Sequence, residues 1–172
     1  MVGNSPRYYW DTCIFLAWLK NEKQRKPGEM DGVREYIQRL MKRQVSIMTS
    51  VLTITEISIA KIPAGTENLL DEVMQRPNFP RIAVDMKIAR LARDLRNYYL
   101  TQNGIDGMTL TVPDSLHLAS AILNKATEFH TFDEHDKPKQ HALGLLPLSG
   151  NVAGHDLIIC KPSAKQLGFA GV

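Results

Sequence analysis

Four acidic residues spread along the chain have contexts that suit metal-dependent chemistry: Asp11, Glu56, Asp114 and Asp133. Asp11 and Asp133 each follow a short run that is typical of a strand. Glu56 lies in a run that is expected to be helical, and Asp114 follows a proline at an expected helix start. Like charges ~4 Å apart repel by about 1 kcal/mol in water and more in a drier cleft. If these carboxylates lie together, a positive charge is needed to offset their repulsion. Mg²⁺ or Mn²⁺ would supply it, because both ions prefer oxygen ligands.

A divalent ion held by such acids can generate hydroxide, orient a phosphodiester and offset the charge that develops on the phosphate, which is nuclease chemistry. Each acid also has a purely structural explanation. Asp11 can cap a helix, Asp114 can be a first-turn acid favoured by the helix dipole, and Glu56 can lie on a solvated helix face. Asp133 and Asp136 can satisfy the backbone of a turn. The order and contexts of the acids, more than any single one, predict the nuclease.

The elements that must position these acids alternate between short strands and helices. Strands are expected at 8–10, 45–49, 82–84, 129–132 and 157–160, and helices at 13–19, 30–41, 51–59 (capped by Ser50), 66–75, 85–101 and 111–123. Residues 103–107 have the composition of a turn. Strands separated by helices favour a parallel sheet, because a parallel return needs a crossover. The predicted fold class is therefore α/β, and its ligands would gather at the carboxyl ends of the strands.

Composition limits the protein to a small set of classes. A chain of 172 residues with 44% hydrophobic composition is long enough for one core, so we expect a single domain over 1–172. A formal net charge of +3 weakly favours nucleic acid as a partner. The two cysteines, Cys13 and Cys160, form neither a disulfide framework nor a paired zinc signature. No run reaches the ~20 apolar residues of a membrane span, so a cytoplasmic location is the expectation.

Four segments of the chain resemble PIN-domain proteins, in particular the toxin component of bacterial VapBC toxin–antitoxin pairs. The segments are Tyr-Tyr-Trp-Asp-Thr at 8–12, Ser-Val-Leu-Thr-Ile-Thr-Glu-Ile at 50–57, Pro-Asp-Ser-Leu-His-Leu-Ala-Ser-Ala-Ile at 113–122 and Phe-His-Thr-Phe-Asp at 129–133. The resemblance covers about 8–148 and implies a PIN-like three-layer α/β/α fold with a mostly parallel sheet. Residues 149–172 would form a C-terminal strand and tail.

The resemblance also implies an activity, a ribonuclease in which Asp11, Glu56, Asp114 and Asp133 hold Mg²⁺ or Mn²⁺ and RNA is cut to 5′-phosphate and 3′-hydroxyl products. It further implies a homodimer and a small antitoxin whose tail blocks the site. Polar support would come from two threonines, Thr12 and Thr131.

One departure from the family pattern concerns the fourth acid. Members often have a further aspartate followed by an aromatic residue, whereas here Asp136 is followed by Lys137. Asp136 therefore remains an alternative to Asp133, which we favour.

Two further readings of the chain stay open. A non-catalytic PIN-like domain that binds RNA or protein would also fit the modest basic patches and the tail. A phospho-receiver domain fits less well, since adjacent acids are missing near the first strand. His117, His130 and His135 lie near the acids, but we leave all three out of the metal set. A histidine without a ligand role is the ordinary case, which applies to His117, and histidine-rich sites favour zinc-like ions, which applies to His130 and His135.

Overall fold

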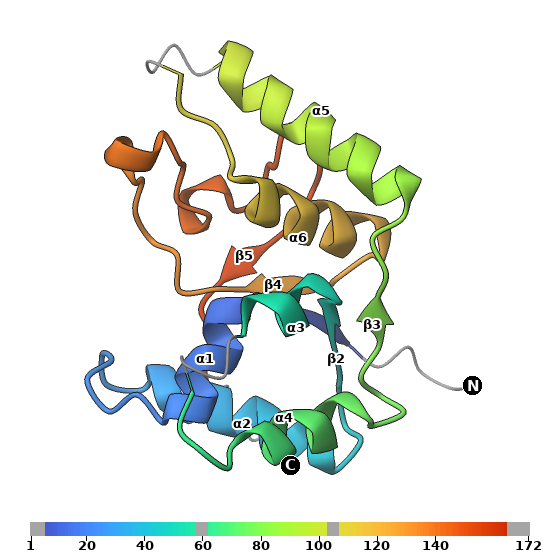
Figure 1. Cartoon of the computed structure of the whole chain (residues 1–172), viewed down its shortest axis with the longest axis vertical. Coiled ribbons are helices and arrows are strands. Elements are labelled where there is room, and N and C mark those ends of the chain that lie inside the picture. The colour runs from blue at the N-terminus through green and yellow to red at the C-terminus, as the bar shows by residue number, and fades with distance from the viewer. Residues whose placement is uncertain (1–5, 58–61, 103–106, 165–172) are drawn as a thin grey trace, which may run out of the picture.

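A computed structural model describes residues 6–57, 62–102 and 107–164 (Figure 1). Five strands form one sheet in the order β3-β2-β1-β4-β5, and every neighbouring pair is parallel. The strands are β1 (Arg7–Trp10), β2 (Ser46–Ser50), β3 (Arg81–Ile82), β4 (Glu128–His130) and β5 (Ile159–Cys160). The prediction of an α/β fold with a parallel sheet is confirmed.

Helices cover both faces of the sheet, which makes the fold a three-layer α/β/α arrangement (Figure 1). One face carries α1 (Thr12–Lys20), α2 (Glu29–Met41) and α4 (Glu67–Met74), and the other carries α5 (Met86–Gln102) and α6 (Val112–Leu123). The one-turn helix α3 (Leu52–Glu56) follows β2, and two 3₁₀ helices, η2 (Pro138–Gln140) and η3 (Leu146–Leu148), lie between β4 and β5.

The central strand explains why two cores form. Side chains alternate across a strand, so Tyr8 and Trp10 pack with α1 and α2 while Tyr9 packs with α5 and α6. All three aromatic side chains are buried. A strand that is buried on both faces reads as a continuous apolar run, and such strands occur in parallel sheets covered by helices. The carboxyl end of β1 is thereby fixed from both sides, directly before Asp11.

Several predicted boundaries are wrong by a few residues, and two of them affect the site. The strand predicted to run to Phe132 ends at His130, so Asp133 lies in the following loop and not at a strand end. The helix predicted over 51–59 begins at Leu52, and its N-cap is Val51 and not the predicted Ser50, because Ser50 is still part of β2. The Ser50 hydroxyl nevertheless accepts a hydrogen bond from the Leu52 N–H. That helix ends at Glu56, and the rest of the predicted range, 58–59, lies outside the described residues, as does most of the predicted turn at 103–107.

No helix within the described residues is both long and apolar enough to cross a membrane.

Candidate functional site: an acidic pocket at the sheet edge

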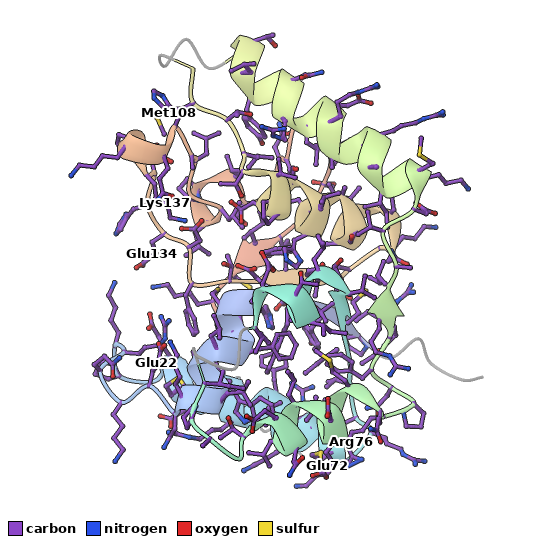
Figure 2. All side chains as sticks on the ribbon, viewed as in Figure 1. Glu22, Glu72, Arg76, Met108, Glu134 and Lys137 are labelled. Atoms are coloured by element: carbon purple, nitrogen blue, oxygen red, sulfur yellow. The ribbon has the colours of Figure 1, made fainter. Side chains whose placement is uncertain are left out.

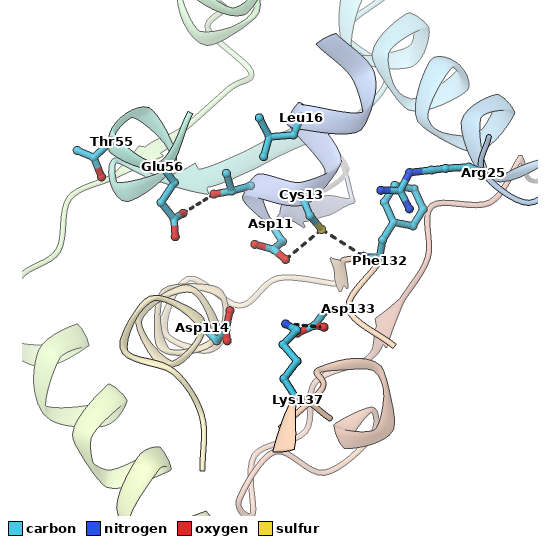
Figure 3. A pocket seen from close by; sticks show the side chains of 11 residues that line it. Asp11, Cys13, Leu16, Arg25, Thr55, Glu56, Asp114, Phe132, Asp133 and Lys137 are labelled. Carbon is cyan, nitrogen blue, oxygen red and sulfur yellow. Dashed lines mark hydrogen bonds and ion pairs between the residues drawn. The ribbon is translucent and has the colours of Figure 1, made fainter. Parts of the chain in front are cut away.

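The four predicted acids line one pocket of about 500 Å³ at the carboxyl edge of the sheet (Figure 3). Asp11 follows β1, Glu56 ends α3, Asp114 lies in the first turn of α6, and Asp133 follows β4. The remaining lining residues are Thr12, Cys13, Leu16, Arg25, Thr55, Phe132 and Lys137. Four elements that are distant in sequence therefore supply one acid each to the same cavity, as expected for the carboxyl ends of parallel strands.

Asp11 occupies the N-cap position of α1 but does not cap that helix. Its backbone is extended, and its side chain makes no cap hydrogen bond. Its Oδ2 instead accepts hydrogen bonds from Thr131 Oγ1 at 2.8 Å and from Cys13 Sγ at 3.2 Å. The Asp11 backbone N–H donates to the His130 carbonyl, which extends the pairing of β1 with β4. Asp11, only 8% exposed, is thus held at the pocket wall by side chains from both flanking segments.

Glu56 is held by a hydrogen-bond relay that joins α3 to α6, β1 and β2. Its Oε2 is bonded to Thr12 Oγ1 and, at 2.8 Å, to His117 Nε2. His117 Nδ1 in turn lies 2.7 Å from the Tyr9 hydroxyl, which accepts the Ser50 N–H. An ionised carboxylate can only accept, so His117 Nε2 must carry a proton and donate it to Glu56. The histidine therefore orients the glutamate and is not available as a metal ligand through Nε2.

The charge environment of His117 favours its protonated form. Burial lowers the pKa of this histidine, but the hydrogen bond and charge of Glu56, together with the charges of Asp11 and Asp114, outweigh burial and raise the pKa above its ordinary value.

Asp114 is fixed by the start of α6. Thr111 is the N-cap residue, its Oγ1 accepts the Asp114 N–H at 3.2 Å, and its hydroxyl donates to Asp114 Oδ2. The pKa of Asp114 is raised, first by burial and then by the charges of Asp11 and Asp133, while Thr111 and Lys137 act in the opposite direction. A carboxylate whose ionisation is opposed by its neighbours is a group that a bound cation would stabilise.

The raised pKa of Asp114 predicts that the ionised Asp114 carboxylate destabilises the folded, metal-free protein, and that this destabilisation depends on pH. Between the ordinary value of 3.8 and the raised folded-state pKa, the folded state binds more protons than the unfolded state, so stability falls as pH rises through this window. Asp114→Asn removes the charge and keeps an acceptor for Thr111. We expect it to raise the melting temperature at pH 7 without metal, by about 2–4 °C for each kcal/mol relieved.

Thermal unfolding of wild type and Asp114→Asn at pH 4 and pH 7 in EDTA measures this cost. The rise in melting temperature caused by Asp114→Asn should be smaller at pH 4 than at pH 7. Added Mn²⁺ should stabilise the wild type more than the variant. If Asp114→Asn is less stable than wild type at pH 7 without metal, the ionised Asp114 carboxylate does not destabilise the folded protein and this prediction is wrong.

Asp133 and Asp136 differ in where their side chains lie. Asp133 lines the pocket, its N–H donates to Thr131 Oγ1, and its Oδ1 is 2.9 Å from Lys137 Nζ. Asp136 is not among the lining residues, and its Oδ1 accepts the Gly144 N–H at 2.8 Å. Asp136 thus shapes the loop after β4, and Asp133 is the acid that this loop presents to the pocket.

Replacing the two aspartates one at a time separates these roles. If RNA cleavage depends on the pocket acids, Asp133→Asn should lower kcat/KM by ~10–100-fold, the range seen when groups around a metal are altered. Asp136→Asn keeps an acceptor for Gly144 and should stay within about 3-fold of wild type by the same reasoning. Steady-state cleavage of one fluorogenic RNA measures both, and the reverse ranking would assign the fourth acid to Asp136.

A second group of potential ligands lies elsewhere on the sheet, formed by Glu128, His130 and Cys160. The buried Trp10 Nε1–H donates to His130 Nδ1 at 3.0 Å, so the proton of a neutral His130 sits on Nε2, which is 2.9 Å from Glu128. That tautomer has no lone pair left for a metal. The group is therefore an internal hydrogen-bonded cluster.

The side chains of the four acids surround the pocket and do not meet at one point. Apart from the Glu128 cluster, no three carboxylate, imidazole or thiol groups in residues 6–57, 62–102 and 107–164 bring ligand atoms within 4.8 Å of one another. All four acids offer oxygen, the donor that Mg²⁺ and Mn²⁺ prefer, and such ions keep several coordinated waters. The acids therefore fit an ion that is bound partly through water.

Fold and site together define a parallel α/β protein with an acidic pocket at the carboxyl edge of its sheet. The family model of the PIN domain matches residues 8–137, and the chain belongs to the PIN domain family.

A solved structure shares the fold at low sequence identity. The crystal structure of VapBC2 from Rickettsia felis bound to a DNA fragment from their promoter has a TM-score of 0.55 and 18% identity, over 89% of this chain and 96% of that one. The crystal structure of FitAcB from Neisseria gonorrhoeae has a TM-score of 0.49 and 18% identity, over 73% and 87%. No curated protein matches the chain.

Three pocket features were missed or undervalued by sequence reasoning. His117 was considered only as a metal ligand, whereas it holds Glu56. Arg25 lies over the Phe132 ring, 3.8 Å from its centroid, and forms one wall of the pocket (Figure 3). Lys137 was noted only as a departure from the family pattern, yet it reaches Asp133. The first two contacts join segments that nothing local in the sequence connects.

Proposed function

We propose that this chain is a Mg²⁺- or Mn²⁺-dependent endoribonuclease whose catalytic and metal-binding residues are Asp11, Glu56, Asp114 and Asp133. The observation that carries the proposal is the convergence of these four acids on one pocket, each from a different element. Membership of a family whose members are generally nucleases supports it. A divalent cation, when bound, activates water and offsets the charge that develops on the phosphate.

The surrounding residues of the chain prepare the pocket for this chemistry. Thr131 holds Asp11, and Thr12 and His117 hold Glu56, so both carboxylates have fixed orientations before a ligand arrives. Fixed ligands lower the reorganisation that binding requires. Burial of Asp11 and Asp114 keeps the local dielectric low and strengthens their attraction for a cation.

The biological role we propose is that of a VapC-like toxin in the cytoplasm, acting as a homodimer and held inactive by a small antitoxin. The sequence resemblance to VapBC toxins and the shared fold support this role. RNA is the proposed substrate.

The products of cleavage test the proposed chemistry. Purified protein is incubated with a panel of structured and single-stranded RNAs in Mn²⁺, and the new ends are mapped. Attack by an activated water should leave 5′-phosphate and 3′-hydroxyl ends. Products with 2′,3′-cyclic phosphate ends would instead point to attack by the RNA 2′-hydroxyl and would contradict the proposed chemistry.

A non-catalytic PIN-like domain that binds RNA or protein is the second candidate. The ion pair between Lys137 and Asp133 favours it, because a cation already neutralises one pocket acid. This candidate predicts that RNA binding persists in EDTA and after Asp11→Asn, with no cleavage in either condition. Filter binding and gel analysis of the same samples distinguish the two candidates.

A further inference from the structure

Lys137 places a permanent positive charge among the acids of the pocket. Its Nζ lies 2.9 Å from Asp133 Oδ1, and its side chain points into the cavity that Asp11 and Asp114 also line (Figure 3). Burial lowers the pKa of Lys137, but the hydrogen bond and charge of Asp133, with the charges of Asp114 and Asp11, outweigh burial and raise it. The ammonium therefore interacts favourably with three of the four acids.

Backbone hydrogen bonds fix the position of Lys137, so its ion pair with Asp133 starts from a well-defined loop. Its N–H donates to the Ala142 carbonyl at 2.7 Å, and its own carbonyl accepts the N–H groups of Gln140 and Ala142. One residue earlier, Asp136 binds the Gly144 N–H. A Cβ at Gly144 would lie 2.7 Å from the His135 carbonyl carbon, which shows how closely the two arms of the loop pack.

Figure 2 shows where this loop projects Lys137, between Met108 and Glu134 in the view, on the segment that follows β4. The side chain starts from a fixed backbone and reaches inward to the acids. A lysine side chain has several rotatable bonds, so its ammonium can leave the pocket while the backbone stays where it is.

We propose that the Lys137 ammonium is a built-in counter-cation, which holds the acidic pocket together without metal and must be displaced when a divalent ion binds. This inference rests on the proposed function, since it concerns the same pocket. A cation and an ammonium that share a carboxylate repel each other at short range, so both cannot keep their best positions. Lys137 would thereby weaken metal binding and make occupancy of the site depend on metal concentration.

The simpler explanation is an exposed ion pair between residues four apart in the chain, since the Lys137 side chain is 44% exposed. Such pairs contribute little, and their removal leaves a nearby site unchanged. The two explanations differ in the sign of the effect on metal affinity. An internal competitor predicts tighter metal binding when its charge is removed, whereas an ordinary surface pair predicts no change.

Calorimetric titration of Mn²⁺ into the full chain at low ionic strength tests the inference, with three variants beside the wild type. Lys137→Met keeps the length and removes the charge, and should bind Mn²⁺ ~3- to 10-fold more tightly, with the difference shrinking in salt. Lys137→Arg keeps the charge and should stay within about 2-fold of wild type. Lys26→Met removes an equal charge from an exposed pair with Glu134, away from the acids, and should also stay within about 2-fold.

Thermal unfolding of the same proteins supplies a second readout. Without metal, Lys137→Met should melt below the wild type because the acids lose their counter-cation, and saturating Mn²⁺ should remove that deficit. Unchanged or weaker Mn²⁺ binding by Lys137→Met would overturn the inference while leaving metal-dependent cleavage intact. Tighter Mn²⁺ binding without any RNA cleavage would support the inference and count against the ribonuclease. Absence of Mn²⁺ binding in every variant would overturn both.

Discussion

Asp11→Asn is expected to reduce kcat/KM for RNA cleavage by at least ~100-fold, since changes to groups that merely orient metal ligands already cost about 10–100-fold. The substitution keeps the size of the side chain and an oxygen that can accept from Thr131, so the fold should survive. It removes one negative charge from the pocket wall, where Asp11 is only 8% exposed. The substitution should therefore lower both the affinity for the divalent ion and kcat.

The measurement is Mn²⁺-dependent cleavage of a single fluorogenic RNA, with circular dichroism to verify folding. Asp156→Asn serves as the matched control, because Asp156 is exposed and does not line the acidic pocket. Cleavage by a folded Asp11→Asn protein within about 3-fold of wild type would remove Asp11 from the catalytic set.

His117→Leu should have the next largest effect, because it breaks the relay that holds Glu56. The Tyr9 hydroxyl and the Glu56 carboxylate each lose a partner in a buried or half-buried setting. Leaving a buried polar group unsatisfied costs about 1–3 kcal/mol of stability. Misorientation of Glu56 should lower kcat/KM by a further ~10–100-fold at temperatures where the variant is folded.

Two companion variants identify the cause of the loss. His117→Gln retains an N–H donor that can reach Glu56, so it should recover part of the activity that His117→Leu loses. His155→Leu, at a half-buried histidine that does not line the acidic pocket, should behave as wild type. Full activity in a stable His117→Leu protein would show that Glu56 needs no partner from α6.

The local pattern was enough to predict where Asp11 and Asp114 lie. Asp11 follows three consecutive aromatic residues, and such a run is typical of a strand that is buried on both faces. Asp114 follows Thr111 and Pro113, and both residues favour a helix start, which the N-cap bond of Thr111 bears out. Burial and capping act within a few residues, so sequence alone reports them well.

Long-range contacts explain what the sequence did not predict. His117 and Glu56 are 61 positions apart, and nothing near either residue indicates that they meet. The end of β4 was misplaced because Phe132 has strand propensity but faces Arg25 outside the sheet, where no neighbouring strand continues the pairing. The contact between His117 and Glu56 and the end of β4 both depend on which segments become neighbours in the complete fold.

The most direct test of the central claim is cleavage of a mixed RNA panel by purified wild-type protein and Asp114→Asn, each with Mg²⁺, with Mn²⁺ and with EDTA. We predict cutting by the wild type with a divalent ion, none in EDTA, and a loss of at least ~100-fold in the variant. Wild-type protein that is folded and binds Mn²⁺ but leaves every RNA intact would contradict the ribonuclease assignment, and cutting that persists in EDTA would contradict the role of the metal.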